Sequence, residues 1–348
     1  MRKKKILLLA VTAANLALAA CGMADGSQTN ETGDVRLILA AYTTPREAFA
    51  EIIPLFQAQW LEQTGQTVTF EESYQGSGAQ SRAVVEGFEA DIVALSLEAD
   101  VTRIEEAGLI THEWHAVGAN GMMSTSVVAF AVRSGNPLGV TDWTDLAAEG
   151  VDILMPNPAT SGGAMWNVLG LYGAVLRGHV DGVRADDPES AKEFLKAVLS
   201  NVTVMDDSAR DSITNFEQGV GDLAITYENE VIVGQEAGID YELVIPSSTI
   251  LIENPVALVD EYVDDHGTRE VAEAFVEFLF TQEVQEIFAR YGLRSVDPDV
   301  AASTADQYPT VPDLFTIEFF GGWAQVRKDI FGETGVFTTA ILEVQRGE

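Results

Sequence analysis

Short apolar segments alternate with segments of helical periodicity, and this alternation is the feature that most restricts the fold of the chain. Residues 35–42 are almost continuously apolar, which predicts a buried strand. Thr44, Pro45 and Glu47 follow with the spacing of a capping box in which Thr44 is the N-cap. Gly65 is the expected end of this helix. Its apolar residues recur at helical spacing: Phe49, Ile52, Ile53, Phe56 and Trp60.

The same alternation continues to residue 227. Helices are expected at about 79–87, 100–107 and 164–177, and another begins near Ala209. The predicted strands lie at residues 68–71, 91–95, 151–155, 202–205 and 223–227. This order predicts an α/β fold with mixed, mostly parallel sheets and flanking helices. The chain of 348 residues is 47% hydrophobic, and its length favours two lobes over one core.

The N-terminus has the pattern of a targeting segment. Four basic residues (2–5) precede an apolar stretch (6–17) that is too short to span a bilayer, and Leu-Ala-Ala-Cys follows at 18–21 like a lipobox. We expect residues 1–20 to be a lipoprotein signal peptide, Cys21 to carry the lipid, and residues 21–34 to be a flexible tether. The alternative is a plain signal peptide in which Cys21, the only cysteine, is incidental.

The chain is strongly acidic. It contains 20 Lys and Arg residues against 54 Asp and Glu residues, a formal net charge of −34. This balance excludes a nucleic-acid partner. The acidic residues are interleaved with apolar ones, which is typical of a folded protein with an acidic surface and favours a halophilic or salt-exposed source.

The sequence gives little support for an enzyme. Its four histidines lack metal-ligand spacing, so no metal site is predicted: His112, His115, His179 and His266. Ser77 and Ser161 lie in glycine-rich turns but not in a Gly-x-Ser-x-Gly motif with a suitable histidine. No cofactor motif is present. A secreted hydrolase remains a distant alternative.

Small or hydroxyl residues stand at four junctions between a predicted strand and the next helix: Thr43-Thr44, Ser77-Gly78, Ser161-Gly162-Gly163 and Ser208-Ala209. In open α/β sheets, ligands bind beyond the carboxyl ends of the strands, where helices begin. Each helix start offers unpaired N–H groups and the positive end of a dipole. One such junction is typical of ordinary helix capping, but four together predict a site for a small anion.

Five stretches also resemble a known family: YQGSGAQSRAVVEGFEADIVAL, VRSGNPLGVTDWTDL, MPNPATSGGAMWN, GVGDLAITYENE and FFGGWAQVRKDIF. The chain resembles the sulfate-binding proteins, the extracytoplasmic receptors of sulfate/thiosulfate ABC importers, over about residues 35–337. The resemblance implies a two-lobed periplasmic-binding-protein-like fold (type II), with sulfate in the interlobe cleft and strand crossovers near 122–132 and 244–257. It also implies that the protein works with ABC permease subunits. We expect a monomer that the lipid on Cys21 anchors to the membrane.

The resemblance further implies how the chain is divided. Lobe 1 would comprise residues 35–125 and 248–310, and lobe 2 residues 126–247. Residues 311–348 would form a C-terminal segment packed on the lobes. The ligand alternatives are other tetrahedral oxyanions, namely thiosulfate, molybdate or phosphate.

The family's anion donors, carried over by position, fall on the junctions described above. The resemblance implies that the hydroxyl of Ser161 donates to the anion, together with four backbone N–H groups: those of Ser77, Gly162, Gly163 and Ala209. Each of these residues belongs to one of the four small-residue junctions.

Two donor positions depart from the family pattern. Thr43 stands where the family has an aspartate, and its main-chain N–H can still donate. Tyr227 stands where the family has a tryptophan, and its alternative role is packing between the lobes.

Arg46 and Arg210 match buried arginines that support the site by pairing with carboxylates. Their alternative is an ordinary surface position.

Overall fold

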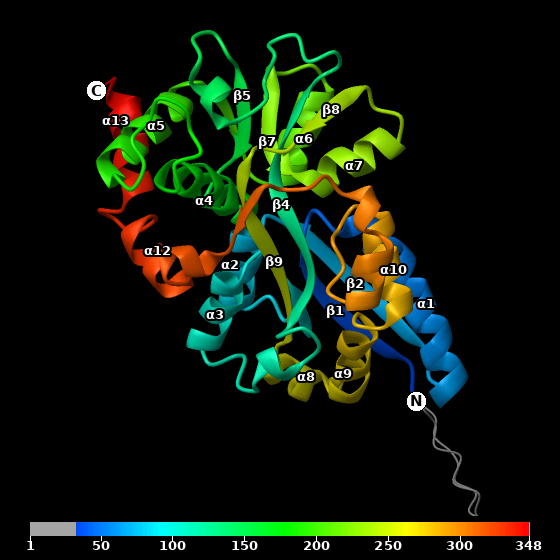
Figure 1. Cartoon of the computed structure of the whole chain (residues 1–348). Coiled ribbons are helices and arrows are strands. Elements are labelled where there is room, and N and C mark those ends of the chain that lie inside the picture. The colour runs from blue at the N-terminus through cyan, green and yellow to red at the C-terminus, as the bar shows by residue number, and fades with distance from the viewer. Residues whose placement is uncertain (1–32, 348) are drawn as a thin grey trace, which may run out of the picture. The chain divides into compact units, whose positions relative to one another are not determined.

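Two long strands, β4 (Met122–Arg133) and β9 (Ser248–Leu258), pair antiparallel in the middle of the fold and join two groups of strands (Figure 1). The computed structural model describes residues 33–347. The predicted signal segment, Cys21 and most of the predicted tether lie outside the described residues. No helix in 33–347 is long and apolar enough to cross a membrane.

The sheet has the strand order β2-β1-β3-β9-β4-β7-β5-β6, with β8 added to β4 and β10 added to β9. The remaining strands are β1 (Val35–Tyr42), β2 (Val68–Gln75), β3 (Ile92–Ala94), β5 (Ile153–Pro156), β6 (Val202–Asp206), β7 (Leu223–Tyr227), β8 (Tyr241–Val244) and β10 (Asp313–Phe315). Every antiparallel pair includes β4 or β9, and the pairs among the other strands are parallel. The predicted α/β class with mixed sheets is confirmed.

Each central strand pairs with both strand groups. One group consists of β1, β2 and β3, and the other consists of β5, β6, β7 and β8. Residues 122–127 of β4 pair with β9, and residues 128–132 pair with β7. In β9, residues 251–255 pair with β4, whereas residues 256–258 pair with β3. The segments expected to cross between lobes correspond to these strands. The division into lobes at residues 125 and 247 stays a prediction.

Helices cover both faces of the sheet (Figure 1). They are α1 (Arg46–Thr64), α2 (Ser77–Val85), α3 (Glu98–Glu106), α4 (Gly162–Leu176), α5 (Pro188–Ser200), α6 (Ala209–Glu217), α7 (Glu228–Glu236), α8 (Asp260–His266), α9 (Arg269–Phe278), α10 (Gln282–Arg290), α11 (Pro298–Ser303), α12 (Trp323–Asp329) and α13 (Val336–Arg346). Short 3₁₀ turns lie at Trp114–Ala116, Trp143–Ala147, Ala305–Gln307 and Ile317–Phe320.

The start of α1 differs from the predicted capping box. Pro45 is the N-cap residue, and no side chain in the described part of the chain caps the helix. A capping box cannot form at Pro45, because proline has no backbone N–H to donate, and the Glu47 carboxylate binds Arg210 instead. The predicted end at Gly65 is confirmed, since its φ of 73° is the left-handed conformation that glycine adopts readily.

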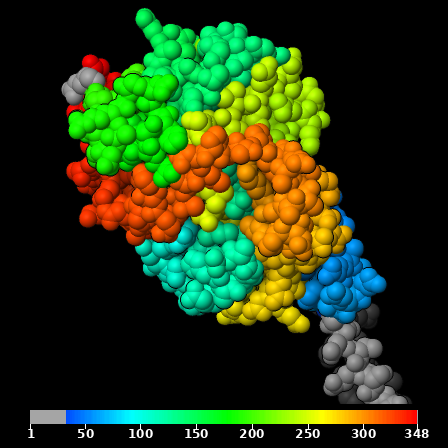
Figure 2. Space-filling model, in the orientation of Figure 1, coloured from blue at the N-terminus to red at the C-terminus, as the bar shows by residue number. Residues whose placement is uncertain are grey.

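The C-terminal part of the chain packs on elements from both strand groups. After α11 it crosses the face of the molecule (Figure 2) and pairs with β9 through β10. In α12, Trp323 contacts Trp166 of α4 edge to face, with ring centroids 4.7 Å apart. In α13, Glu343 forms ion pairs with Lys192 and Lys196 of α5.

Candidate functional site

Three of the four small-residue junctions meet at Gly76, between β2 and α2. A Cβ atom on Gly76 would lie 2.6 Å from the carbonyl oxygens of both Thr160 and Asp207. Only glycine therefore fits here without a shift of backbone. The backbone amide of Ala79 in α2 also donates to the Thr160 carbonyl at 3.0 Å. The junctions that precede α2, α4 and α6 are thus in direct contact.

The turn Ser161-Gly162-Gly163 lies in the middle of the cluster formed by these junctions. A Cβ on Gly162 would lie 2.6 Å from Ser96 Oγ. A Cβ on Gly163 would lie 2.7 Å from Cε2 of Tyr227 and 3.4 Å from Cβ of Ala209. The two glycines let three other segments approach the start of α4, namely the ends of β3 and β7 and the start of α6.

The predicted amide donors belong to the first turns of three helices: Ser77 in α2, Gly162 and Gly163 in α4, and Ala209 in α6. Within residues 33–347, no protein oxygen accepts a hydrogen bond from these four amides. First-turn amides have no partner inside their own helix, and each helix start carries a partial positive charge. Three helix starts therefore present uncompensated donors in one cluster.

The hydroxyls of the predicted serines have different surroundings. Ser77 Oγ donates to Asp100 at 2.6 Å and accepts from the amide of Ser96 at 3.0 Å, so its hydroxyl is occupied and its amide is the free group. Ser161 caps α4, and its Oγ accepts weakly from the Ala164 amide at 3.4 Å. The hydroxyl hydrogen of Ser161 stays free to donate.

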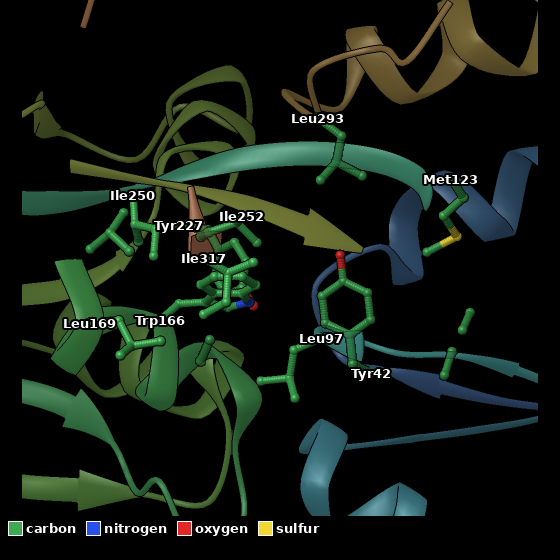
Figure 3. Close-up of a cluster of buried hydrophobic side chains, with 14 of the residues drawn as sticks. Tyr42, Leu97, Met123, Trp166, Leu169, Tyr227, Ile250, Ile252, Leu293 and Ile317 are labelled. Atoms are coloured by element: carbon green, nitrogen blue, oxygen red, sulfur yellow. The ribbon is translucent and has the colours of Figure 1, made fainter. Parts of the chain in front are cut away.

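Tyr227 is the last residue of β7, and its side chain is only 1% exposed. Its hydroxyl lies 2.7 Å from Ser96 Oγ, and its ring lies 6.3 Å from the ring of Tyr42. Figure 3 shows Tyr42 and Tyr227 in one buried cluster with Trp166. Burial raises the pKa of Tyr227 well above the ordinary value of 10, so the phenol keeps its proton at neutral pH.

Thr43 lies at the edge of the cluster. It is half-buried and lines a groove of about 390 Å³ together with Arg46, Thr160, Ser208 and Arg210. The structure therefore brings Thr43 to the same region as the other predicted donors. It does not bring Thr43 into the close contacts around Gly163.

Arg210 pairs with two carboxylates. Its Nη1 lies 2.5 Å from Glu47 of α1, and its Nε lies 2.7 Å from Glu230 of α7. Burial alone would lower the pKa of Arg210, but attraction by Glu230 and Glu47 raises it. Burial raises the pKa of Glu230, and Arg210 opposes that shift. The guanidinium is neutralised by its own partners and lends the site little positive charge.

The expectation of a buried, paired arginine at position 46 is wrong. Arg46 is exposed, and its guanidinium lies over the ring of Tyr74 at 4.6 Å from the centroid. As the first residue of α1, it extends along β2 toward the groove. In the described part of the chain, no carboxylate forms an ion pair with it.

Sequence reasoning missed Ser96, which forms hydrogen bonds with two predicted site residues. It lies just past the carboxyl end of β3, 1% exposed, and contacts Ser77 and Tyr227. The strand-end rule that selected the other junctions also applies to this one. No glycine stands beside Ser96 to mark it in the sequence.

The cluster can bind a small oxyanion through neutral N–H and O–H donors. In residues 33–347, no group of three or more His, Cys, Asp or Glu side chains is arranged to hold a metal ion. A buried anion at this position would be compensated mainly by dipoles and hydrogen bonds, because Arg210 is already paired with Glu47 and Glu230 and Arg46 is exposed.

This fold and this site are those of a binding protein for small solutes. The family model described as bacterial extracellular solute-binding protein matches residues 37–294, and the chain belongs to that class. Within the class it belongs to the sulfate-binding protein family, as the following relatives show.

Two curated sulfate-binding proteins illustrate the likeness. That of Synechococcus elongatus is 44% identical over 94% of this chain and 92% of its own length. That of Escherichia coli is 40% identical over 87% of this chain and 92% of its own length. A thiosulfate-binding protein of Pseudomonas aeruginosa is 35% identical over 96% of this chain and 98% of its length.

A solved structure agrees with these relatives. The sulfate-binding protein of Mycobacterium tuberculosis is 36% identical, with a TM-score of 0.77, over 84% of this chain and 98% of its own. A periplasmic thiamin-binding protein, 14% identical with a TM-score of 0.65, shares the fold alone. The chain is therefore a binding protein and not an enzyme, which excludes the hydrolase alternative.

Proposed function

We propose that this protein is an extracytoplasmic receptor that binds sulfate and delivers it to an ABC importer. The observation that carries the proposal is the meeting of three helix starts whose first-turn amides have no acceptor in the described chain. The proposed donors are these amides, the Ser161 hydroxyl and the Tyr227 hydroxyl, with the Thr43 amide at the edge. Arg210 supports the site from outside by holding α1, α6 and α7 together.

Sulfate fits such a donor set better than hydrogen phosphate does. Sulfate is fully deprotonated at neutral pH, so each of its oxygens accepts hydrogen bonds. Hydrogen phosphate keeps one O–H, which needs an acceptor in the site. A buried polar group without a partner costs about 1–3 kcal/mol.

Thiosulfate is the second candidate, because one relative of this chain is named a thiosulfate-binding protein. Thiosulfate also lacks a proton at neutral pH, and it carries one larger sulfur atom. Molybdate and phosphate remain further alternatives among tetrahedral oxyanions.

We place the anion between two lobes, formed by residues 35–125 with 248–310 and by residues 126–247. The joining strands β4 and β9 would then allow the lobes to open for ligand entry. We also propose that Cys21 carries a lipid that anchors the protein, as a monomer, to the outer face of the membrane. The net charge of −34 favours surroundings rich in salt.

Isothermal titration of the purified protein with sulfate, thiosulfate, molybdate and hydrogen phosphate tests the ligand class. The proposal expects saturable binding of sulfate at one site per chain. Binding of none of the four anions would overturn it. Tighter binding of thiosulfate than of sulfate would favour the second candidate.

A further inference from the structure

Ser96 is held rigidly by contacts to both strand groups. Its amide donates to Ser77 Oγ at 3.0 Å. Its carbonyl accepts from Trp166 Nε1 at 2.9 Å and from Asn254 Nδ2 at 3.2 Å. Three hydrogen bonds therefore hold the backbone of Ser96 in place independently of its side chain.

The Ser96 side chain reaches across the site to Tyr227. The two hydroxyl oxygens lie 2.7 Å apart, a normal length for an O–H···O hydrogen bond, and both residues are 1% exposed. Gly162 packs against Ser96 Oγ, and Gly163 packs against the ring of Tyr227. The hydroxyl pair thus lies directly against two of the proposed amide donors.

The hydroxyls of Ser96 and Tyr227 carry two hydrogens, and the hydrogen bond between them uses only one. The other hydrogen can donate to a different acceptor. If Tyr227 donates to Ser96, the phenol hydrogen is used up inside the pair. If Ser96 donates to Tyr227, the phenol hydrogen is free for a bound anion. A phenol is the more acidic of the two groups and makes the stronger charge-assisted bond. A bound dianion therefore favours the second arrangement, in which the two bonds also strengthen each other.

We propose that Ser96 is a positioning residue that determines specificity. It donates to the Tyr227 oxygen, directs the phenol hydrogen at the oxyanion, and occupies the lone pair that a protonated oxyanion would need as an acceptor. This inference rests on the proposed function, since it assigns a role toward the same anion. It predicts that Ser96 contributes to the preference for sulfate over hydrogen phosphate.

The test compares sulfate and hydrogen phosphate binding at about pH 8 for wild type, Ser96→Ala, Tyr227→Phe and the double variant. Loss of one buried hydrogen bond should weaken sulfate binding by about 5- to 10-fold in Ser96→Ala. Hydrogen phosphate binding should change by less than about 2-fold, because the freed lone pair of Tyr227 can accept its proton. In the Tyr227→Phe background, Ser96→Ala should change sulfate binding by less than about 2-fold.

Two further variants serve as controls. Ser248→Ala removes another buried serine hydroxyl, which donates to Asp313 at 2.7 Å and, within residues 33–347, forms no hydrogen bond with the cluster. It should leave both affinities unchanged. Ser96→Cys keeps a weak donor and should lie between wild type and Ser96→Ala. It also provides the comparison if Ser96→Ala does not fold.

An equal loss of affinity for both anions in Ser96→Ala would overturn the proposal, because a merely structural role predicts that result. The same effect of Ser96→Ala with and without the Tyr227 hydroxyl would also overturn it. Failure of the wild type to bind sulfate would instead reject the proposed function.

Discussion

The backbone amide of Ala79 donates to the carbonyl oxygen of Thr160 at 3.0 Å, which ties the first turn of α2 to the loop before α4. These residues belong to different strand groups, since α2 follows β2 and α4 follows β5. The bond brings two helix starts to one point without any side chain. The proposed amide donors are therefore positioned by the path of the backbone.

Gly163→Ala should weaken sulfate binding by about 10-fold or more, because its Cβ would lie 2.7 Å from the Tyr227 ring and would push it away from the helix start. Gly33→Ala is the matched control, since among residues 33–347, its chain neighbour apart, no atom lies within 4 Å of its Cβ position. Titration of both variants with sulfate checks the prediction. Equal affinities in the two variants would contradict it.

Tyr227→Phe removes the phenol hydrogen and should weaken sulfate binding by about 10- to 100-fold, the usual range for a charge-assisted hydrogen bond. Tyr227→Trp keeps a donor and should retain binding. It should discriminate against hydrogen phosphate at least as sharply as wild type does, because an indole cannot accept a proton. If Tyr227→Phe binds sulfate as wild type does, Tyr227 only packs between the strand groups.

Arg210→Met should destabilise the fold by about 2 kcal/mol or more, because it leaves the Glu230 carboxylate, 1% exposed, without its cation. Adding Glu230→Gln to this variant should recover much of the loss. Urea unfolding measures both effects. Arg36→Met breaks an exposed pair with Glu71 and should cost less than about 1 kcal/mol. An equal cost for Arg210→Met and Arg36→Met would show that the Arg210 pairs are not important for stability.

His266 should make stability depend on pH. Burial lowers its pKa, but hydrogen bonding and attraction by Asp91 outweigh burial and raise the pKa above the ordinary 6.5. A group whose pKa is raised on folding stabilises fully below its unfolded pKa and loses that contribution as pH rises through the folded pKa. The stability difference between wild type and His266→Gln should therefore shrink above pH 6.5. A difference that grows with pH would contradict this assignment.

Much of the fold follows from local patterns. The apolar segment at residues 35–42 is β1, and the helix expected to end at Gly65 is α1. The turn Ser161-Gly162-Gly163 marks the start of α4, because small residues are required where other segments approach a helix end. These features depend on a few neighbouring residues, which the sequence displays directly.

The predictions that were wrong or missing concern features that depend on residues far apart in the sequence. Glu47, expected to help cap α1, instead binds Arg210, 163 residues later. Ser96 was not predicted because its place in the site depends on the contact with Tyr227, 131 residues away. A capping motif or a lone serine looks the same in the sequence whether or not such a distant partner exists.

We propose that the anion is held by uncharged donors at three helix starts. A crystal structure with bound selenate, located by its anomalous signal, tests this most directly. We expect the anion within about 2.7–3.2 Å of four backbone amides, with no guanidinium in contact: those of Ser77, Gly162, Gly163 and Ala209. An anion bound instead to Arg46 in the outer groove, with these amides unoccupied, would contradict it.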